Sequence, residues 1–419
     1  MNFHKTGIIV FALLIGAGAS AQFIASPYSN NGLGEVLFQG MPNNYGMGEV
    51  GIGSPTPWHI NLQNPALLTH NTFSSFQVGL IGDFRNHEST VGKDKDSGAS
   101  LRFMAMSFPV IRNRWTTSFA LLPLSSVKYH TYSQDSIDTG VLGITQFQGD
   151  GGLSQLIWAN GFRIYKSLAL GVKASYVFGT IERQSRVQIF SEDFSSNYAI
   201  AYLESTAYSD FNFSLGLSYR WILQEKKFLN FGATYDLSNT LEGTENQIFQ
   251  RLRLTGTTVQ TQIIKENIKT EFTLPKTFGL GVSYELLNTF QVGVDVKTQN
   301  WKSANEKTTA VSLRNTQNVA VGVSWTPDYQ SVNSYLKRTT YRMGMNMKQL
   351  PYLVNNREIN DFGINFGASF PVSGFSSLDA AFKFGTRGTT DSNLIKENYF
   401  QVVIGATIND RWFVKRRYD

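Results

Sequence analysis

The eleven residues from Phe211 to Trp221 read FNFSLGLSYRW. Phe211, Phe213, Leu215, Leu217, Tyr219 and Trp221 alternate strictly with Asn212, Ser214, Gly216, Ser218 and Arg220. Successive side chains of a β-strand point to opposite faces, so this segment predicts a strand with one apolar face and one polar face. The same alternation recurs in residues 168–179, 290–297, 362–370, 378–385 and 400–409. This persistent period of two predicts an all-β chain.

Two architectures can produce such strands: a soluble sandwich or propeller, and a membrane barrel whose apolar face meets lipid. The alternating segments run about 10 to 25 residues, longer than strands of soluble proteins, and carry aromatic residues near their ends. Small and polar residues occupy the other face, as a wet or filled lumen requires. Within hydrocarbon only a closed barrel satisfies the backbone groups of every strand, so we predict a transmembrane antiparallel β-barrel.

We expect about 14 strands, an even number as in single-chain outer-membrane barrels. They begin near Phe73, Leu101, Trp115, Leu153, Leu168, Ala199, Phe228, Ile263, Phe290, Ala310, Arg338, Phe362, Leu378 and Tyr399. The alternation fades in residues 132–150, and residues 251–275 are compatible with two short strands or one long bent strand. Residues 85–100 and 299–308 are polar and charged, which predicts long surface loops.

The first 21 residues have the layout of a secretory signal peptide. A short start with Lys5 precedes an apolar run from Ile8 to Ile15, and Ala19-Ser20-Ala21 forms a small-residue cleavage site. The run is too short to span about 30 Å of hydrocarbon, so we expect cleavage before Gln22 and export rather than a membrane anchor. After this leader no apolar window is long enough for a transmembrane helix.

Composition narrows the class of protein further. The chain has 419 residues, of which 13% are aromatic and only 16% are charged, against roughly 25% charged in soluble domains. It has no cysteine, which excludes a lipoprotein anchor, a disulfide framework and a cysteine metal site. A net charge of +6 over this length is too small to indicate a nucleic-acid partner.

Residues 22–72, between the leader and the first strand, are rich in Gly, Asn, Ser and Pro and show no periodicity. Such a stretch is either a disordered arm or a plug packed inside the barrel, and its scattered apolar residues favour packing. Near its end lies Asn64-Pro65-Ala66. Because proline cannot donate to a sheet ladder, this tripeptide predicts irregular structure before the first strand.

Several motifs resemble the FadL-type outer-membrane transporters of hydrophobic compounds, and the resemblance spans nearly all of the mature chain. They are Asn64-Pro65-Ala66, the run LPKTFGLGVSY from Leu274 to Tyr284, Gly293-Val294-Asp295 followed by Trp301, and Tyr341-Arg342-Met343-Gly344 in the fourth strand from the end. The resemblance implies a 14-stranded barrel with an N-terminal hatch in its lumen, closed by Asn64, Pro65 and Ala66, and diffusion of an apolar ligand past that hatch. We accordingly divide the chain into a signal peptide (1–21), a hatch or plug (22–72), a barrel (73–410) and a basic C-terminal tail (411–419). That tail departs from the aromatic ending of many outer-membrane barrels, and it is read either as an assembly signal or periplasmic contact or as a solvated terminus.

Catalytic chemistry has little support in the sequence. Past the leader the only histidines are His59, His70, His87 and His130, and neither a Gly-x-Ser-x-Gly nor a His-Glu-x-x-His motif occurs. We therefore expect no enzyme, no catalytic or metal residues and no cofactor. Five charged residues fall on the polar face of predicted strands and are expected to line the lumen, as a polar path or as ion pairs: Lys173, Arg220, Asp295, Lys297 and Lys383.

Two functions follow as expectations. The first is passive transport of hydrophobic or amphipathic small molecules such as fatty acids across the cell outer membrane, with outer-membrane lipid and the ligand as partners. The second is a barrel scaffold that docks a secretion complex or another envelope protein through its loops. Function depends on sites placed on a fold, so the resemblance does not separate these two. A transporter requires a continuous apolar cavity, whereas a docking barrel can be filled.

Overall fold

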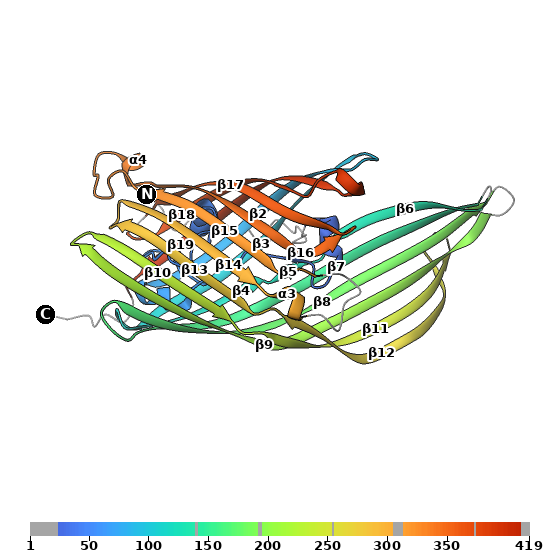
Figure 1. Cartoon of the computed structure of the whole chain (residues 1–419), viewed down its shortest axis with the longest axis horizontal. Coiled ribbons are helices and arrows are strands. Elements are labelled where there is room, and N and C mark those ends of the chain that lie inside the picture. Colours follow the sequence, from blue (N-terminus) through green and yellow to red (C-terminus); the bar gives the residue numbers. More distant parts are fainter. Residues whose placement is uncertain are drawn as a thin grey trace, which may run out of the picture.

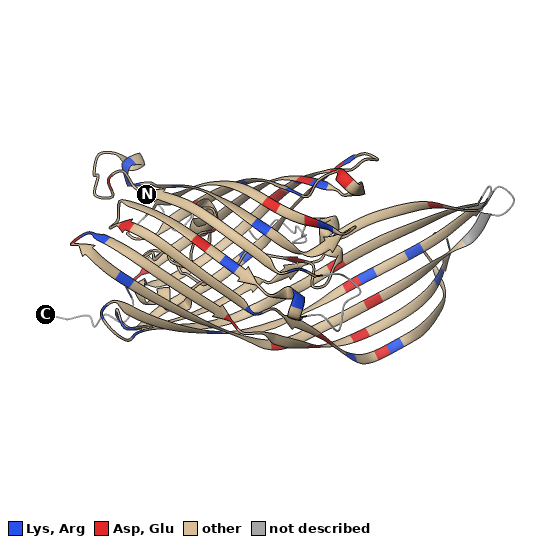
Figure 2. Cartoon of the chain, viewed as in Figure 1, with Lys and Arg blue, Asp and Glu red and all other residues tan. Residues whose placement is uncertain are grey.

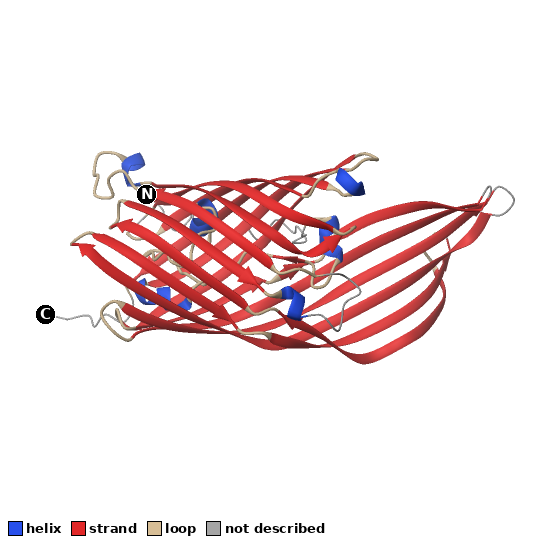
Figure 3. Ribbon diagram, viewed as in Figure 1, coloured by secondary structure: helices blue, strands red, loops and turns tan. Residues whose placement is uncertain are grey.

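In the computed structural model, residues 24–138, 141–191, 195–253, 255–304, 313–372 and 374–411 are described. The predicted signal peptide and the tail beyond Arg411 lie outside these residues. Strands make up almost the whole molecule, and the helices are short (Figure 3). The helices are η1 (Pro27–Asn30), α2 (Pro42–Gly46), η2 (Pro65–His70), α3 (Trp301–Ala304), α4 (Tyr335–Arg338) and η3 (Asp391–Asn393). Within the described ranges, no helix is long and apolar enough to cross a membrane.

The strands form one closed antiparallel barrel (Figure 1). Its first half contains β2 (Ser74–Glu88), β3 (Lys93–Ile111), β4 (Trp115–Pro123), β6 (Tyr129–Asp138), β7 (Val141–Arg163), β8 (Leu168–Ser191), β9 (Ser195–Gln224), β10 (Lys227–Asp236) and β11 (Asn239–Arg253). Its second half contains β12 (Thr258–Leu274), β13 (Thr277–Leu286), β14 (Phe290–Gln299), β15 (Thr316–Trp325), β16 (Thr340–Val354), β17 (Arg357–Pro371), β18 (Ser377–Arg387) and β19 (Lys396–Asp410). β19 pairs with β2 and closes the wall.

The predicted number of strands is confirmed, because three wall strands are each interrupted once. β4 and β6 both pair with β7, β10 and β11 both pair with β9, and β12 continues into β13. Counted this way, the described wall has 14 strands. The ambiguous residues 251–275 hold the end of β11 and the whole of β12.

One loop prediction is wrong. Residues 85–100 belong to the ends of β2 and β3. The pairing of these strands already starts at Glu88 and Lys93, so only Ser89–Gly92 form the turn between them. The predicted strand starts at Leu101 and Leu153 are likewise too late, since β3 begins at Lys93 and β7 at Val141. These outer parts of the strands meet water on both faces, so neither face needs to be apolar and the alternation disappears. Of the second predicted loop, residues 299–308, Gln299 ends β14, residues 301–304 form α3, and residues 305–308 lie outside the described part of the chain.

The outward face of β9 locates the membrane. From Phe211 to Trp221 its outward side chains are large, apolar and exposed, and the same face continues as Ser209, Ala207 and Ser205. The apolar part has the length of about 9–11 residues that a tilted strand needs to cross hydrocarbon. β9 has 30 residues and β8 has 24, so a large part of each lies beyond the membrane.

The excess length lies in one sector of the barrel. β6, β7, β8, β9, β11 and β12 continue far past the ends of the other strands, on the side away from α4 (Figure 1). We call this projecting part, residues 129–152, 179–208 and 239–274, the half-sheet. It carries both acidic and basic positions (Figure 2). The turns at the other end are mostly short, as at the periplasmic end of outer-membrane barrels.

Candidate functional site: the lumen and its N-terminal segment

Residues 24–73, here called the N-terminal segment, lie inside the barrel. α2 contacts β16, β17, β18 and β19, while η2 contacts β4, β7, β8 and β9 on the opposite side. Met41, Ile60, Leu62 and Leu68 are buried among wall residues in the largest apolar cluster. The two-residue strand β1 (Glu35–Val36) pairs with β5 (Ser125–Ser126), where the chain leaves the wall between β4 and β6. The segment therefore fills the width of the lumen.

A ring of wall glycines, here called the glycine girdle, lets the segment approach the wall. Its members each lie on a different wall strand and each have an atom of the N-terminal segment where a Cβ would stand: Gly161, Gly171, Gly216, Gly232, Gly281, Gly293, Gly322, Gly344, Gly367 and Gly405. A Cβ on Gly232 would overlap the carbonyl oxygen of Ile52, and one on Gly344 would lie against the backbone nitrogen of Gly48. Glycine is required here for close backbone approach rather than for its backbone conformation.

The tripeptide Asn64-Pro65-Ala66 sits against this girdle. The Asn64 side chain accepts a hydrogen bond from the Ala66 amide (3.1 Å) at the start of η2 and donates to the carbonyl oxygens of Ile52 (2.8 Å) and Leu217 of β9 (3.0 Å). A Cβ on Gly171 or Gly216 would overlap this tripeptide. The tripeptide thus links three parts of the structure: the N-terminal segment at Ile52, the start of η2 and the barrel wall at β9.

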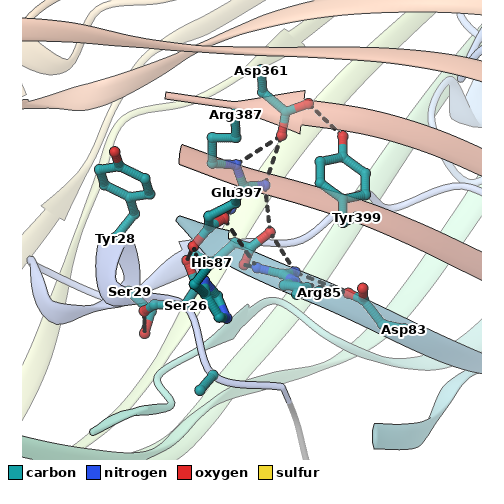
Figure 4. Close-up of polar contacts among 12 residues, drawn as sticks. Ser26, Tyr28, Ser29, Asp83, Arg85, His87, Asp361, Arg387, Glu397 and Tyr399 are labelled. Carbon is teal, nitrogen blue, oxygen red and sulfur yellow. Dashed lines mark hydrogen bonds and ion pairs between the residues drawn. The ribbon is translucent and has the colours of Figure 1, made fainter. Parts of the chain in front are cut away.

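A buried ion-pair network fastens the beginning of the segment (Figure 4). Glu35 pairs with Arg85 of β2 (2.9 Å) and Arg387 of β18 (2.7 Å), and Arg387 pairs with Asp361 of β17 (2.7 Å). Ser26 donates to Glu397 of β19, which faces both arginines. Burial alone would raise the pKa of Glu35, but the Arg387 and Arg85 guanidiniums outweigh it and hold this pKa well below its ordinary value. We call this cluster the arginine latch.

Two further charge contacts hold the middle of the segment. Glu49 pairs with Lys383 of β18 (2.8 Å) and with Lys348 of β16. Although burial opposes it, the pull of Lys348 and Lys383 lowers the pKa of Glu49. Asp295 of β14 accepts hydrogen bonds from the amides of Gly51 (2.6 Å) and Ile52 (2.7 Å).

The end of the lumen near Arg411 is closed by aromatic rings. Trp58 stacks on Phe375 with ring centroids 5.1 Å apart, and Phe375 lies 4.4 Å from Phe73. Arg411 lies over the rings of both phenylalanines. Just inside this layer His59 contacts Asp379 of β18 at 3.0 Å.

The structure brings some of the residues predicted from the sequence together and separates others. Lys383 and Asp295 contact the N-terminal segment directly. Lys173 and Lys297 line a cavity of about 310 Å³ that residues of the segment also line, and Lys297 lies 3.8 Å from Asp236. Arg220 lies elsewhere in the wall, where it pairs with Glu285 and its Nε donates a hydrogen bond to the Asn230 side-chain oxygen (2.9 Å).

Sequence reasoning missed the arginine latch, Glu49, the His59–Asp379 contact and the glycine girdle. Only the girdle left a signal, namely glycine recurring on the polar face of strand after strand, as at Gly216 and Gly293. Across the described part of the chain, no three His, Cys, Asp or Glu side chains come together as metal ligands.

The comparison of sequences identifies the family. The family model described as BamG matches residues 3–419. The chain belongs to the BamG family. No curated protein matches it in sequence.

Solved structures share the fold of this BamG family member. The toluene transporter TodX of Pseudomonas putida is 14% identical over 89% of this chain and 99% of its own, with a TM-score of 0.60. A FadL homologue of Pseudomonas aeruginosa is 13% identical, covering 89% and 98%, with a TM-score of 0.58. The toluene transporter TbuX of Ralstonia pickettii is 13% identical, covering 89% and 99%, with a TM-score of 0.57. These likenesses show that the chain has the barrel fold of the FadL-type structures.

Proposed function

We propose that this protein is an outer-membrane scaffold that docks another envelope protein on its half-sheet. The observation that carries this proposal is the one-sided projection of β6 to β9, β11 and β12 beyond the membrane. Crossing the membrane needs only about 9–11 residues per strand. Ordering the additional residues costs conformational entropy. Transport of a small molecule across the membrane does not require this extra strand length.

The lumen supports the same proposal. Small apolar ligands bind in cavities lined mainly by apolar side chains with few polar groups. The cavity that the N-terminal segment borders has a mixed lining, in which charged residues from most sides of the barrel lie among the apolar ones: Glu35, Glu49, Asp83, Arg85, Arg102, Lys173, Asp236, Asp295, Lys297, Lys348, Asp361, Lys383 and Arg387. Such a lining suits a filled, rigid barrel better than a path for hydrocarbons.

The test is a variant in which the half-sheet is trimmed at register pairs near the membrane. Hairpins closed at Tyr129–Gly149, Ile181–Thr206 and Gly243–Thr270 remove the projecting strands and keep the wall. We expect heat-modifiable mobility in gels, which reports a folded barrel, to be kept. Native mass spectrometry of the intact chain purified from its own membrane should show a stoichiometric protein partner that the trimmed variant lacks.

A matched control removes residues 329–336 at the opposite end, where the Asp328 amide bonds to the Lys337 carbonyl oxygen. This control should keep the partner. Purification of the intact chain without any stoichiometric partner would contradict docking.

A second function is favoured by a different observation, the interruption of the wall between β4 and β6. There the cavity is bordered by residues of β3 (Gly98–Ser100) and by Ser125 and Ser126 of β5, so it reaches a break in the hydrogen-bonded wall. Passive entry of a hydrophobic or amphipathic compound such as a fatty acid, past an N-terminal hatch, would use this break. Lipid extraction and mass spectrometry of the intact chain and of a variant lacking residues 22–71 test it: a bound apolar ligand lost with the segment supports transport.

A further inference from the structure

The inner face of the half-sheet carries an unpartnered apolar surface. Arg183 identifies this face, because its guanidinium bonds to the carbonyl oxygens of Asn30 and Gly32 inside the barrel. Further along β8 the same face continues as Ser185, Val187 and Ile189, by strand alternation.

The strand register extends this face across four strands. Phe147 lies opposite Ser185, Ser185 opposite Tyr202, and Tyr202 opposite Phe249. In the next row Val187 lies opposite Ile200. We call Phe147, Val187, Ile189, Ile200, Tyr202 and Phe249 the concave patch.

The concave patch is the uncovered continuation of an existing interface. Nearer the membrane the same inner face packs on the N-terminal segment, where Leu33 joins Val177, Ile181 and Leu241 in one buried cluster. Beyond that point, among the described residues, this face is open: Ile200 is 45% exposed and Ile189 is 40% exposed. The patch lies outside the apolar belt of the barrel, so these side chains face water rather than lipid.

The charged side chains on the β11 border of the concave patch are both basic. Arg251 lies opposite Ile200 and Arg253 opposite Tyr198, and both are exposed on the patch side. From Asn246 to Lys265 the chain has no acidic residue. Among the described residues neither arginine has an ion-pair partner, and Arg251 rests only on the ring of Tyr198. Charge complementarity therefore favours an acidic partner at this border.

We infer that the concave patch binds a segment of another protein whose apolar side chains cover Phe147, Tyr202 and Phe249 and whose acidic side chains meet Arg251 and Arg253. This inference rests on the proposed docking function and names the surface and the chemistry of the partner. The geometry suits a protein rather than a lipid, because the patch is the inside of a curved sheet and faces away from the membrane belt.

The test uses the full chain in its own cells, with the photoreactive residue p-benzoylphenylalanine as the probe. It replaces Phe249 on the patch, Phe147 three strands away on the same face, or Gln250, which follows Phe249 and points to the opposite face. We expect Phe249 and Phe147 to crosslink to one and the same protein, identified by mass spectrometry, and Gln250 to give no such product.

Charge reversal provides the second readout. Arg253→Glu and the double variant Arg251→Glu, Arg253→Glu should lower the crosslink yield about tenfold, because like charges repel across an interface. Arg186→Glu, which reverses a charge on the outer face of the same half-sheet, should leave the yield unchanged. Heat-modifiable mobility checks that each variant folds.

Three results would overturn the inference: equal crosslinking from Gln250, crosslinking only to a second copy of the chain, or no product from either patch position. The last result leaves docking itself intact if native mass spectrometry still finds a stoichiometric partner, which would then bind elsewhere. If the intact chain has no partner at all, the proposed function fails as well.

Discussion

Glu49 and Lys383 form an ion pair in the interior of the barrel, with 2.8 Å between the Oε1 and Nζ atoms and about one-twentieth of each side chain exposed. The two residues are separated by 334 positions in the sequence. Glu49 also pairs with Lys348, so one carboxylate balances two lysines. Removing this carboxylate leaves the buried Lys383 and the partly exposed Lys348 without their ion-pair partner.

Glu49→Gln is therefore expected to destabilise the folded barrel by about 3–5 kcal/mol, as for other broken buried ion pairs. Lys383→Met should cost less, because Glu49 keeps Lys348. The measurement is urea unfolding in lipid vesicles followed by tryptophan fluorescence. An equal cost for the two variants would contradict this account of one carboxylate shared by two lysines.

The glycine girdle predicts a strong effect from a single methyl group. Gly232→Ala should displace the N-terminal segment near Ile52 and cost about 1–3 kcal/mol, as expected for overpacking. Limited proteolysis should then cut residues 24–73 faster than in the unmodified chain. Gly92→Ala is the control, because nothing lies within 4 Å of a Cβ at Gly92. Equal protection of the segment in both variants would show that it does not seat on the girdle.

The arginine latch predicts acid sensitivity of the N-terminal segment. The pKa of Glu35 is lowered in the folded protein from an ordinary value of 4.5, so its unfolded form takes up protons first as the pH falls. The stabilisation from Glu35 is therefore complete above about pH 4.5 and is lost as the pH falls below that value towards the folded pKa. Protease protection of the segment should decline below this pH.

Glu35→Gln should reduce protection at neutral pH and flatten part of the acid dependence. Part of the acid dependence of protease protection should remain in this variant, because the pKa of Glu49 is lowered as well. An unchanged acid profile in Glu35→Gln would exclude Glu35 as a source of the sensitivity.

The barrel wall was predictable from the sequence because lipid imposes one apolar face on every strand. The run from Phe211 to Trp221 shows this most clearly. The outer halves of β3 and β7 were missed for the converse reason: outside lipid, residues such as Lys93–Ser100 can be polar on both faces. The sequence therefore predicted that these strands exist but did not predict how far they extend into the half-sheet.

The lumen was predictable only in its residue types. Lys383 and Asp295 were placed on the polar face, but alternation carries no information about which residue lies across the lumen. Their partners Glu49 and Gly51 belong to a segment without periodicity. In the sequence His59 was only one of four histidines past the leader, whereas in the structure it pairs with Asp379.

Asn64 provides the last prediction. Its amide nitrogen donates to the carbonyl oxygens of Ile52 and Leu217, and its oxygen accepts from the Ala66 amide. Asn64→Ala should leave these buried backbone groups unpaired and cost about 1–3 kcal/mol. Asn64→Asp keeps the acceptor but places a negative charge beside two carbonyl oxygens, so it should cost at least as much.

Gln63→Ala is the matched control, because the neighbouring side chain makes only one longer hydrogen bond, 3.3 Å to the Glu49 carbonyl oxygen. Urea unfolding of the three variants in lipid vesicles measures the differences. If Asn64→Ala and Gln63→Ala unfold at the same urea concentration, the tripeptide does not fasten the segment to β9. If only the Asn64 variants are weakened and residues 24–73 become protease-sensitive in them, the contact with Leu217 is one of the points that hold the segment in the lumen.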